Sequence, residues 1–392
     1  MNLFLAIILI YLAYTSSILI RNLFSISKLE DFLPNEKIEV SQSPVISICI
    51  PARNEERSIS KSVEAACRLS YTDFEVIVLN DQSTDATGDI LNSLLEKFPN
   101  TLKVIQGTEK PSDWLGKPFA CHQLSKHASG EYLIFVDADT ILSDEAVSAA
   151  LNVMRSNNLG FCTVWPRQIT DNVSEKIIIP HVYFALLTLL PWHYTERKPK
   201  WMPNFFHQRF KDMFAAACGQ YVMFTREAYH QIGGHESVKN EVVEDVALAK
   251  MIKNADITMK MLYGSTQVAC RMYESHQEVW QGFRKNFFAG FSYNLFLFLI
   301  MAIIHIAVFL VPIGILLASL FVDMSSEIIM LSLLAFMIVL VQRAAVQRLM
   351  SLPLLYSFTH PIGVIWFQIL GLRCISDYLL GKKVSWKDRQ VN

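Results

Sequence analysis

The chain has 392 residues, of which 52% are hydrophobic, and its formal net charge is −1 at pH 7. Because a nearly neutral chain lacks the strong basic field of nucleic-acid-binding proteins, we expect no nucleic-acid partner. The seven cysteines form no Cys-x-x-Cys pair, which favours reduced thiols in a cytosolic domain over a disulfide or zinc framework.

The first apolar run, Leu3 to Ile20, is close to the ~20 residues that a helix needs to cross a bilayer. No basic residue precedes it and no small-residue cleavage site follows it, whereas Arg21 and Lys28 come after it. These flanks favour a retained membrane anchor over a cleaved signal peptide, and they predict a cytoplasmic location for the next segment.

Residues 44–290 alternate between short apolar runs and amphipathic segments. The predicted strands are 45–50, 74–79, 102–105 and 132–136, and the predicted helices begin at Ser58, Asp85, Lys117 and Ser143. This alternation predicts an α/β domain with a mostly parallel sheet and right-handed crossovers. The sequence contains neither the G-x-G-x-x-G nor the P-loop motif.

Acidic residues follow two predicted strands and recur farther along the chain, at Asp81, Asp137, Asp139, Glu244 and Asp245. In open α/β sheets ligands bind beyond the carboxyl ends of the strands, so these acids predict a site for a metal and a phosphate-bearing ligand. Two alternatives stay open. Asp81 and Asp85 suit turn and helix-cap roles, and Glu244 and Asp245 suit the first turn of a helix.

A second signal lies between Ile177 and Lys211. An apolar stretch, 177–190, is followed there by basic residues interleaved with aromatic ones, among them Trp192, Trp201 and Phe206. This mixture suits a bilayer interface with anionic headgroups and predicts an acceptor or membrane side for the site. The alternative is a buried core helix followed by a solvated loop.

The C-terminal third is again strongly apolar. Leu295 to Val322 and Ile328 to Val341 predict a membrane hairpin, because their linker lacks Lys and Arg while Arg343 and Arg348 follow. The stretch 352–372 contains two prolines and predicts a third span, a re-entrant pair or an interfacial helix.

We therefore expect a multi-pass protein of the cytoplasmic membrane with its α/β domain on the cytoplasmic side. The expected parts are an anchor, an α/β domain, a group of membrane or interfacial helices and a basic tail, at residues 1–22, 44–290, 292–381 and 382–392. The basic residues of the tail are Lys382, Lys383, Lys387 and Arg389.

Six short motifs occur in order along residues 44–290. They are Ile48 to Glu56, Asn80-Asp81-x-Ser83-x-Asp85, Gly116-Lys117, Asp137-x-Asp139, Gly233-Gly234 and Glu244-Asp245-x-x-Leu248-Ala249. Together they resemble the family 2 glycosyltransferases of GT-A fold. Residues 271–273 and 280–286, with the terminal apolar helices, are most similar to the membrane branch that glycosylates carotenoids, hopanoids and related lipids.

The resemblance implies an inverting glycosyltransferase that uses a nucleotide-diphosphate sugar, for example UDP-glucose, and a hydroxyl or carboxyl group of a membrane lipid. Asp139, with Asp137, would hold Mg²⁺ or Mn²⁺, and hard oxygen ligands suit both ions. The implied donor-binding residues are Pro51, Ala52, Asn54, Glu55, Asp81, Lys117 and Asp137. For Lys117 a phosphate contact and simple solvation remain equal alternatives.

Attack by an acceptor hydroxyl requires a base, and Asp245 is the candidate, with Glu244 beside it. No separate nucleophile is evident, which indicates single displacement. Gln281 and Arg284 match part of the Q-x-x-R-W motif of the longer synthases in the family, but Lys285 stands where Trp is expected. This departure disfavours a processive synthase, and we assign Gln281 and Arg284 to the acceptor side.

Three other functions remain as alternatives. A polysaccharide or polyprenyl-phosphate sugar synthase would share the fold. A nucleotidyltransferase would be expected to carry a glycine- and lysine-rich loop, which Pro51 to Arg57 is not. A non-catalytic membrane scaffold or transport protein would tolerate the loss of the acidic residues, yet all of them are present.

Overall fold

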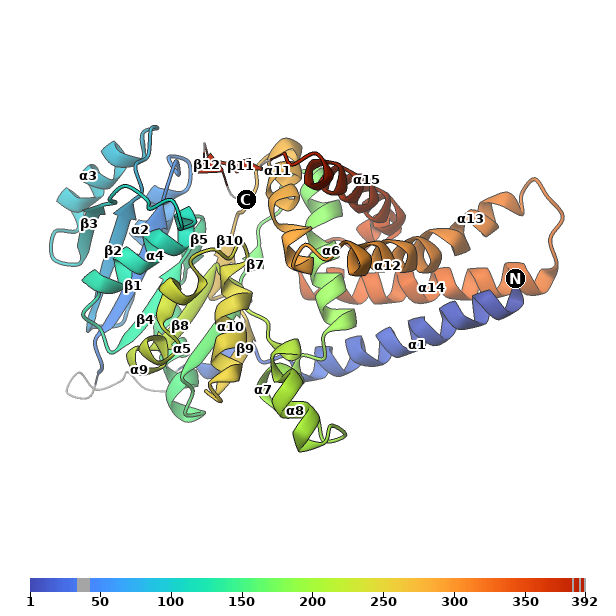
Figure 1. The fold of residues 1–392 in the computed structure, drawn as a ribbon, viewed down its shortest axis with the longest axis horizontal. Helices are drawn as coiled ribbons and strands as arrows, with labels where there is room; N and C mark the ends of the chain where they lie inside the picture. The colour runs from blue at the N-terminus through green and yellow to red at the C-terminus, as the bar shows by residue number, and fades with distance from the viewer. Residues whose placement is uncertain (34–42, 383, 388, 391–392) are drawn as a thin grey trace.

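The computed structural model describes residues 1–33, 43–382, 384–387 and 389–390. A sheet domain occupies one end of the molecule and long helices extend from the other (Figure 1). Lys383 of the basic tail lies outside the described residues.

Seven strands form the central sheet. Their order is β3 (Leu102–Gln106), β2 (Phe74–Asn80), β1 (Ile46–Ala52), β4 (Tyr132–Val136), β8 (Tyr221–Thr225), β6 (Phe161–Trp165) and β9 (Met259–Tyr263). Only β8 runs antiparallel to its neighbours β4 and β6, and the other pairs are parallel. The predicted mostly parallel sheet is therefore confirmed.

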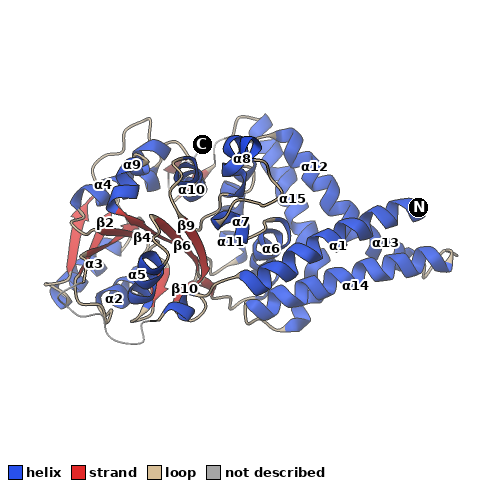
Figure 2. Cartoon of the chain, turned by 90° about the horizontal axis from the view of Figure 1, so that it is seen from below, coloured by secondary structure: helices blue, strands red, loops and turns tan. Residues whose placement is uncertain are grey.

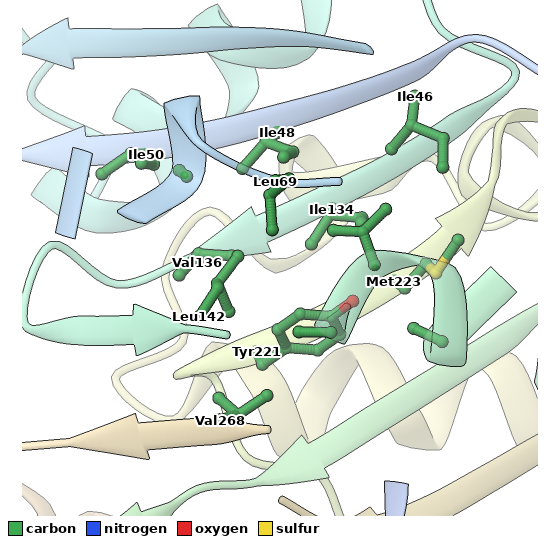
Figure 3. Packing of buried hydrophobic residues seen from close by; sticks show 14 of the residues in the cluster. Ile46, Ile48, Ile50, Leu69, Ile134, Val136, Leu142, Tyr221, Met223 and Val268 are labelled. Atoms are coloured by element: carbon green, nitrogen blue, oxygen red, sulfur yellow. The ribbon is translucent and has the colours of Figure 1, made fainter. Parts of the chain in front are cut away.

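Helices cover both faces of this sheet (Figure 2). One face packs against α2 (Ile59–Cys67), α3 (Thr87–Lys97) and α5 (Ala146–Ser156), and the other packs against α4 (Gly116–His127), α9 (Arg226–Gln231) and α10 (Glu244–Asn254). Ile48, Ile134 and Met223, from three neighbouring strands, lie in one buried layer (Figure 3). Burial on both faces explains why the central strands are continuous apolar runs.

A second, three-stranded sheet follows the end of β4. It contains β5 (Thr140–Leu142), β10 (Val268–Cys270) and β7 (Arg167–Gln168). The helix predicted to begin at Ser143 begins instead at Ala146, because residues 140–142 pair with β10. This pairing places Asp139 at the junction of the two sheets.

Four helical stretches are long and apolar enough to cross a membrane. They are α1 (Asn2–Ser25), Leu295–Ala318, α14 (Ser326–Leu349) and Leu354–Leu379. The second joins α12 (Leu295–His305) to α13 (Val311–Ala318) through a π-helical segment, and the fourth contains α15 (His360–Leu379). Of the stretch 352–372, whose state the sequence left open, residues 354–372 thus belong to a helical stretch of spanning length.

The helix α6 (Val173–Leu189) runs across these long helices, between them and the sheet domain (Figure 1). The buried Asn22 joins α6 to the end of α1. Its amide nitrogen donates to the carbonyl oxygens of Leu187 and Leu190, both at 2.8 Å, and its Oδ1 accepts from the Trp192 backbone N–H at 2.8 Å.

Replacing Asn22 by Ala should destabilise the protein by about 1–3 kcal/mol, because backbone groups at the end of α6 lose buried partners. Thermal unfolding in detergent measures the change. Ser17→Ala is the matched control, since Ser17 is exposed and bonds only to its own helix at the Tyr14 carbonyl. Equal melting temperatures for the two variants would contradict the prediction.

Candidate active site

Two loops at the carboxyl ends of β1 and β2 are joined by hydrogen bonds. The Asn54 Oδ1 accepts from the Thr84 N–H at 2.9 Å, and the Asn54 N–H donates to the Ser83 Oγ at 3.1 Å. The Glu55 N–H donates to the Thr87 Oγ1 at 2.8 Å. Asn54 has a φ of 51°, in the left-handed region that Asn tolerates better than most residues. Its side chain therefore holds the loop in place.

Asp81 follows β2 and is only 4% exposed. One carboxylate oxygen forms an ion pair with Arg389, and the other is buried without a hydrogen-bond partner among the described residues. Asp85 differs, because its oxygens accept from the Thr87 N–H at 3.0 Å and the Glu56 N–H at 3.1 Å. The turn-and-cap alternative thus describes Asp85, whereas the Asp81 carboxylate retains an open acceptor.

Lys117, in the first turn of α4, connects the two acidic groups of the site. Its ammonium lies 2.7 Å from Asp137 Oδ1 and 2.9 Å from Glu244 Oε1. Burial alone would lower the pKa of Lys117, but Asp137 and Glu244 raise it well above its ordinary value. Simple solvation, one of the two alternatives for this lysine, is therefore wrong.

Asp139 lies in the same loop as Asp137, between β4 and β5. Burial, followed by the charges of Asp137 and Glu55, raises the pKa of Asp139 to about 7. Such crowding of carboxylates favours a cation. Within the described ranges no three His, Cys, Asp or Glu side chains form a ready metal cluster. A pair of aspartates still fits Mg²⁺ or Mn²⁺, because such ions commonly take their remaining ligands from phosphates and water.

Asp245 lies in the first turn of α10. Its carboxylate accepts from the Gly219 N–H at 2.7 Å and from the Val246 N–H at 2.8 Å. Burial and the charge of Glu244 raise the pKa of Asp245 to about 6. A Cβ on Gly219 would lie 3.1 Å from the Lys117 ammonium, so glycine allows this close packing.

Lys117, Asp137, Glu244 and Asp245 share one pocket, whose lining does not include Asp81 or Asp139. It is lined by Pro51, Lys117, Cys121, Phe135, Asp137, Gly219, Val222, His235, Glu244, Asp245 and Leu248. Asp137 from the end of β4 and Asp245 from α10 therefore face the same space, although 108 positions separate them in the sequence. Glu244 stays ionised there, because Lys117 lowers its pKa although burial opposes this.

Three basic residues of the site were not assigned from the sequence. Lys285, in α11 (His276–Asn286), is influenced by the charges of Glu244, Lys117 and Asp137, and burial lowers its pKa. The other two, Lys387 and Arg389, contact Glu55 and Asp81. Two features of the sequence pointed to these residues: the lysine at 285, where the motif has Trp, and the basic character of the tail.

The predicted acceptor-side residues fall in different environments. Arg284 pairs with Asp377 of α15 at 2.6 Å, and Gln281 is exposed on α11. Trp192 is 2% exposed, and its indole N–H donates to the Met261 carbonyl at 3.0 Å. Trp192, which was predicted on the acceptor or membrane side, therefore does not face a bilayer interface, because its ring fills the contact between β9 and the helices.

Trp201 and Phe206, in contrast, are 66% and 51% exposed. They lie in and beside α8 (Asn204–Phe210). We call this the aromatic surface. Its members are Trp201, Phe205, Phe206, Phe210 and Met213.

Comparison with known proteins identifies the domain that carries this pocket. Residues 47–233 match the family model described as Glycosyl transferase family 2. The chain contains a family 2 glycosyltransferase domain. It is 29% identical over 248 residues to the 4,4'-diaponeurosporenoate glycosyltransferase of Staphylococcus aureus strain USA300, a match that covers 62% of this chain and 61% of the relative. The matched part is thus about three fifths of the length of that curated relative.

Among solved structures, the family 2 domain and its helices are similar to a mannosyltransferase from Pyrobaculum calidifontis in complex with GDP-Man and Mn²⁺. The TM-score is 0.54 at 15% identity, and the match covers 97% of this chain and all of the other. This likeness shows the fold, which is the GT-A fold that the motifs implied.

The raised pKa of Asp245 makes the stability of the family 2 domain depend on pH. The folded state binds this proton more tightly than the unfolded state, so the carboxylate costs stability as pH rises from about 4 to about 6. Relative to wild type, Asp245→Asn should therefore be more stable at pH 7 than at pH 4.5, by about 1–2 kcal/mol.

Melting temperatures at the two pH values measure this difference. Asp144→Asn removes the same charge from an exposed position and should show no such dependence. If the melting-temperature difference between Asp245→Asn and wild type stays constant, or falls as pH rises, the raised pKa of Asp245 is contradicted.

Proposed function

We propose that this chain transfers a sugar from a nucleotide-diphosphate sugar to a hydroxyl or carboxyl group of a membrane lipid, with inversion at the sugar. The observation that supports this most directly is the shared pocket of Asp137 and Asp245, held together by Lys117. In this pocket Asp137 is the acid suited to a donor, and Asp245 is the candidate base.

On the donor side, the loops after β1 and β2 would receive the nucleoside. The open acceptor of Asp81 suits an N–H or O–H of the base or ribose. Asp139 and Asp137 would hold Mg²⁺ or Mn²⁺, which when bound neutralises the charge that develops on the leaving diphosphate. UDP-hexoses such as UDP-glucose are the donors that we expect.

On the acceptor side, Asp245 would take the proton of the attacking hydroxyl. Two backbone N–H groups fix the direction of its carboxylate. With a pKa of about 6 the group is mostly ionised at pH 7, yet it is more basic than an ordinary aspartate. An acceptor carboxylate needs no such step, because it carries no proton at this pH.

A lipid acceptor is supported by the surroundings of the pocket. Four helices of the described part of the chain are long and apolar enough to cross a bilayer, and the aromatic surface exposes large apolar side chains. The name of the curated relative gives 4,4'-diaponeurosporenoate, so a carotenoid or related isoprenoid lipid is the acceptor class that we favour. Arg21, which follows the apolar run near the C-terminal end of α1, supports a cytoplasmic position for the catalytic domain in the cytoplasmic membrane.

Asp245→Asn should keep donor binding but lower kcat, since general-base catalysis contributes typically ~10²–10⁴-fold. The assay incubates host membranes with a panel of nucleotide sugars and follows the lipid extract by mass spectrometry, while calorimetry measures binding of the nucleoside diphosphate. Asp139→Ala, by comparison, should lose turnover and metal-dependent nucleotide binding together. If Asp245→Asn also fails to bind the nucleotide, Asp245 belongs to the donor site instead.

The double variant Trp201→Ser/Phe206→Ser should raise the apparent KM for the lipid acceptor several-fold and leave donor hydrolysis nearly unchanged. Removing exposed aromatic rings weakens the contact with the bilayer interface but does not touch the pocket. Leu95→Ser, on α3, is the control for loss of an exposed apolar side chain. An unchanged KM, or a preference for a water-soluble acceptor, argues against the membrane route.

A further inference from the structure

The segment that follows α15 returns to the sheet domain and ends beside the donor loops (Figure 1). Arg389 forms an ion pair with Asp81, and its Nη2 donates to the Gln82 Oε1 at 3.0 Å. Lys387 forms an ion pair with Glu55. Both cations therefore contact the two loops that we assign to the nucleotide.

A third contact fixes the backbone of this segment. The Arg53 Nε donates to the Lys387 carbonyl at 3.0 Å, and the Arg53 Nη1 donates to the Asp81 carbonyl at 2.7 Å. Arg53 thus connects the tail to the loop after β2. The side chains of Arg389 and Asp81 are only 17% and 6% exposed, so this ion pair is unlike the solvated surface pairs that contribute little.

The position of Arg389 is electrostatically unusual. A Cβ on Gly116 would lie 3.2 Å from the Arg389 Nη1, so the guanidinium lies against the first turn of α4. Helix N-termini carry partial positive charge and favour anions. The Asp81 carboxylate is this anion here, because one of its oxygens lies 3.8 Å from the same Cβ position and pairs with Arg389; a bound phosphate would take over that role.

The charges around the site also favour a role for these two cations in binding an anion. Glu55, Asp81, Asp137 and Asp139 lie on the donor side, and Lys117 is already shared between Asp137 and Glu244. A diphosphate that enters this acidic surface needs further positive charge. Lys387 and Arg389 bring two such charges, and Arg in particular binds phosphate oxygens through two parallel hydrogen bonds.

We propose that Lys387 and Arg389 are donor-binding residues that transfer from Glu55 and Asp81 to the diphosphate when a nucleotide-diphosphate sugar binds. This inference rests on the proposed function. The second Asp81 oxygen, which has no hydrogen-bond partner among the described residues, is open to the nucleoside both before and after this exchange. No covalent bond changes, and the two ion pairs within the protein are replaced by two with the ligand.

Calorimetry on the full-length protein tests this with UDP and GDP in the presence of Mn²⁺, and with uridine and guanosine as ligands that lack phosphate. Arg389→Ala and Lys387→Ala should each raise the Kd for the bound diphosphate at least fivefold and change the Kd for its nucleoside less than twofold. Arg389→Lys keeps the positive charge, so it should raise the Kd for the diphosphate less than Arg389→Ala does. Lys382→Ala removes an exposed cation just after α15 and is the control.

The other outcomes are distinct. Tighter diphosphate binding by Arg389→Ala would mean that the tail only obstructs the site, and equal binding would mean that the ion pairs are purely structural. If Arg389→Ala weakens diphosphate and nucleoside binding equally, Arg389 contacts the nucleoside instead of the diphosphate. Each of these overturns the inference while leaving the proposed function intact. A wild-type protein that binds neither UDP nor GDP would instead count against the proposed function itself.

Discussion

The site depends on one ammonium that pairs with two carboxylates. Lys117 holds the carboxylates of Asp137 and Glu244 at hydrogen-bonding distance, so the end of β4 and the start of α10 are fixed against each other. Because the side chains of Lys117 and Asp137 are 36% and 26% exposed, solvent screens this pair in part, and its main effect is to position the two elements. The same ammonium keeps Glu244 ionised, and Glu244 in turn makes its neighbour Asp245 more basic.

Electrostatic strain is concentrated around this lysine. The pKa values of Asp139 and Asp245 are raised to about 7 and about 6, chiefly by burial and by adjacent carboxylates. A fold selected only for stability would avoid such crowding, and perturbed titration of this kind is typical of functional sites. The rest of the domain supports it with close packing, including the backbone approach that Gly219 permits.

Local patterns in the sequence were sufficient for β1 to β4 and for the acids that follow β2 and β4, but β6, β8 and β9 of the central sheet were not predicted. Asp81, Asp137 and Asp139 come directly after apolar runs, and the period of those runs determines where each strand ends. The antiparallel β8 was not foreseen, because its pairing with β4 joins segments about 90 residues apart in sequence, beyond any local pattern. Trp192 was misassigned for a related reason, since composition alone does not distinguish an interfacial indole from one that fills a core.

The contacts of the tail have a consequence for biosynthesis. Glu55 and Lys387 are 332 positions apart, and Asp81 and Arg389 are 308 apart. Chains are made from the N-terminus, so the sheet domain emerges from the ribosome well before the segment after α15 does. In the proposed topology, the long apolar helices enter the bilayer in the meantime. The loops after β1 and β2 of a nascent chain would therefore remain without these two cations until membrane insertion is complete.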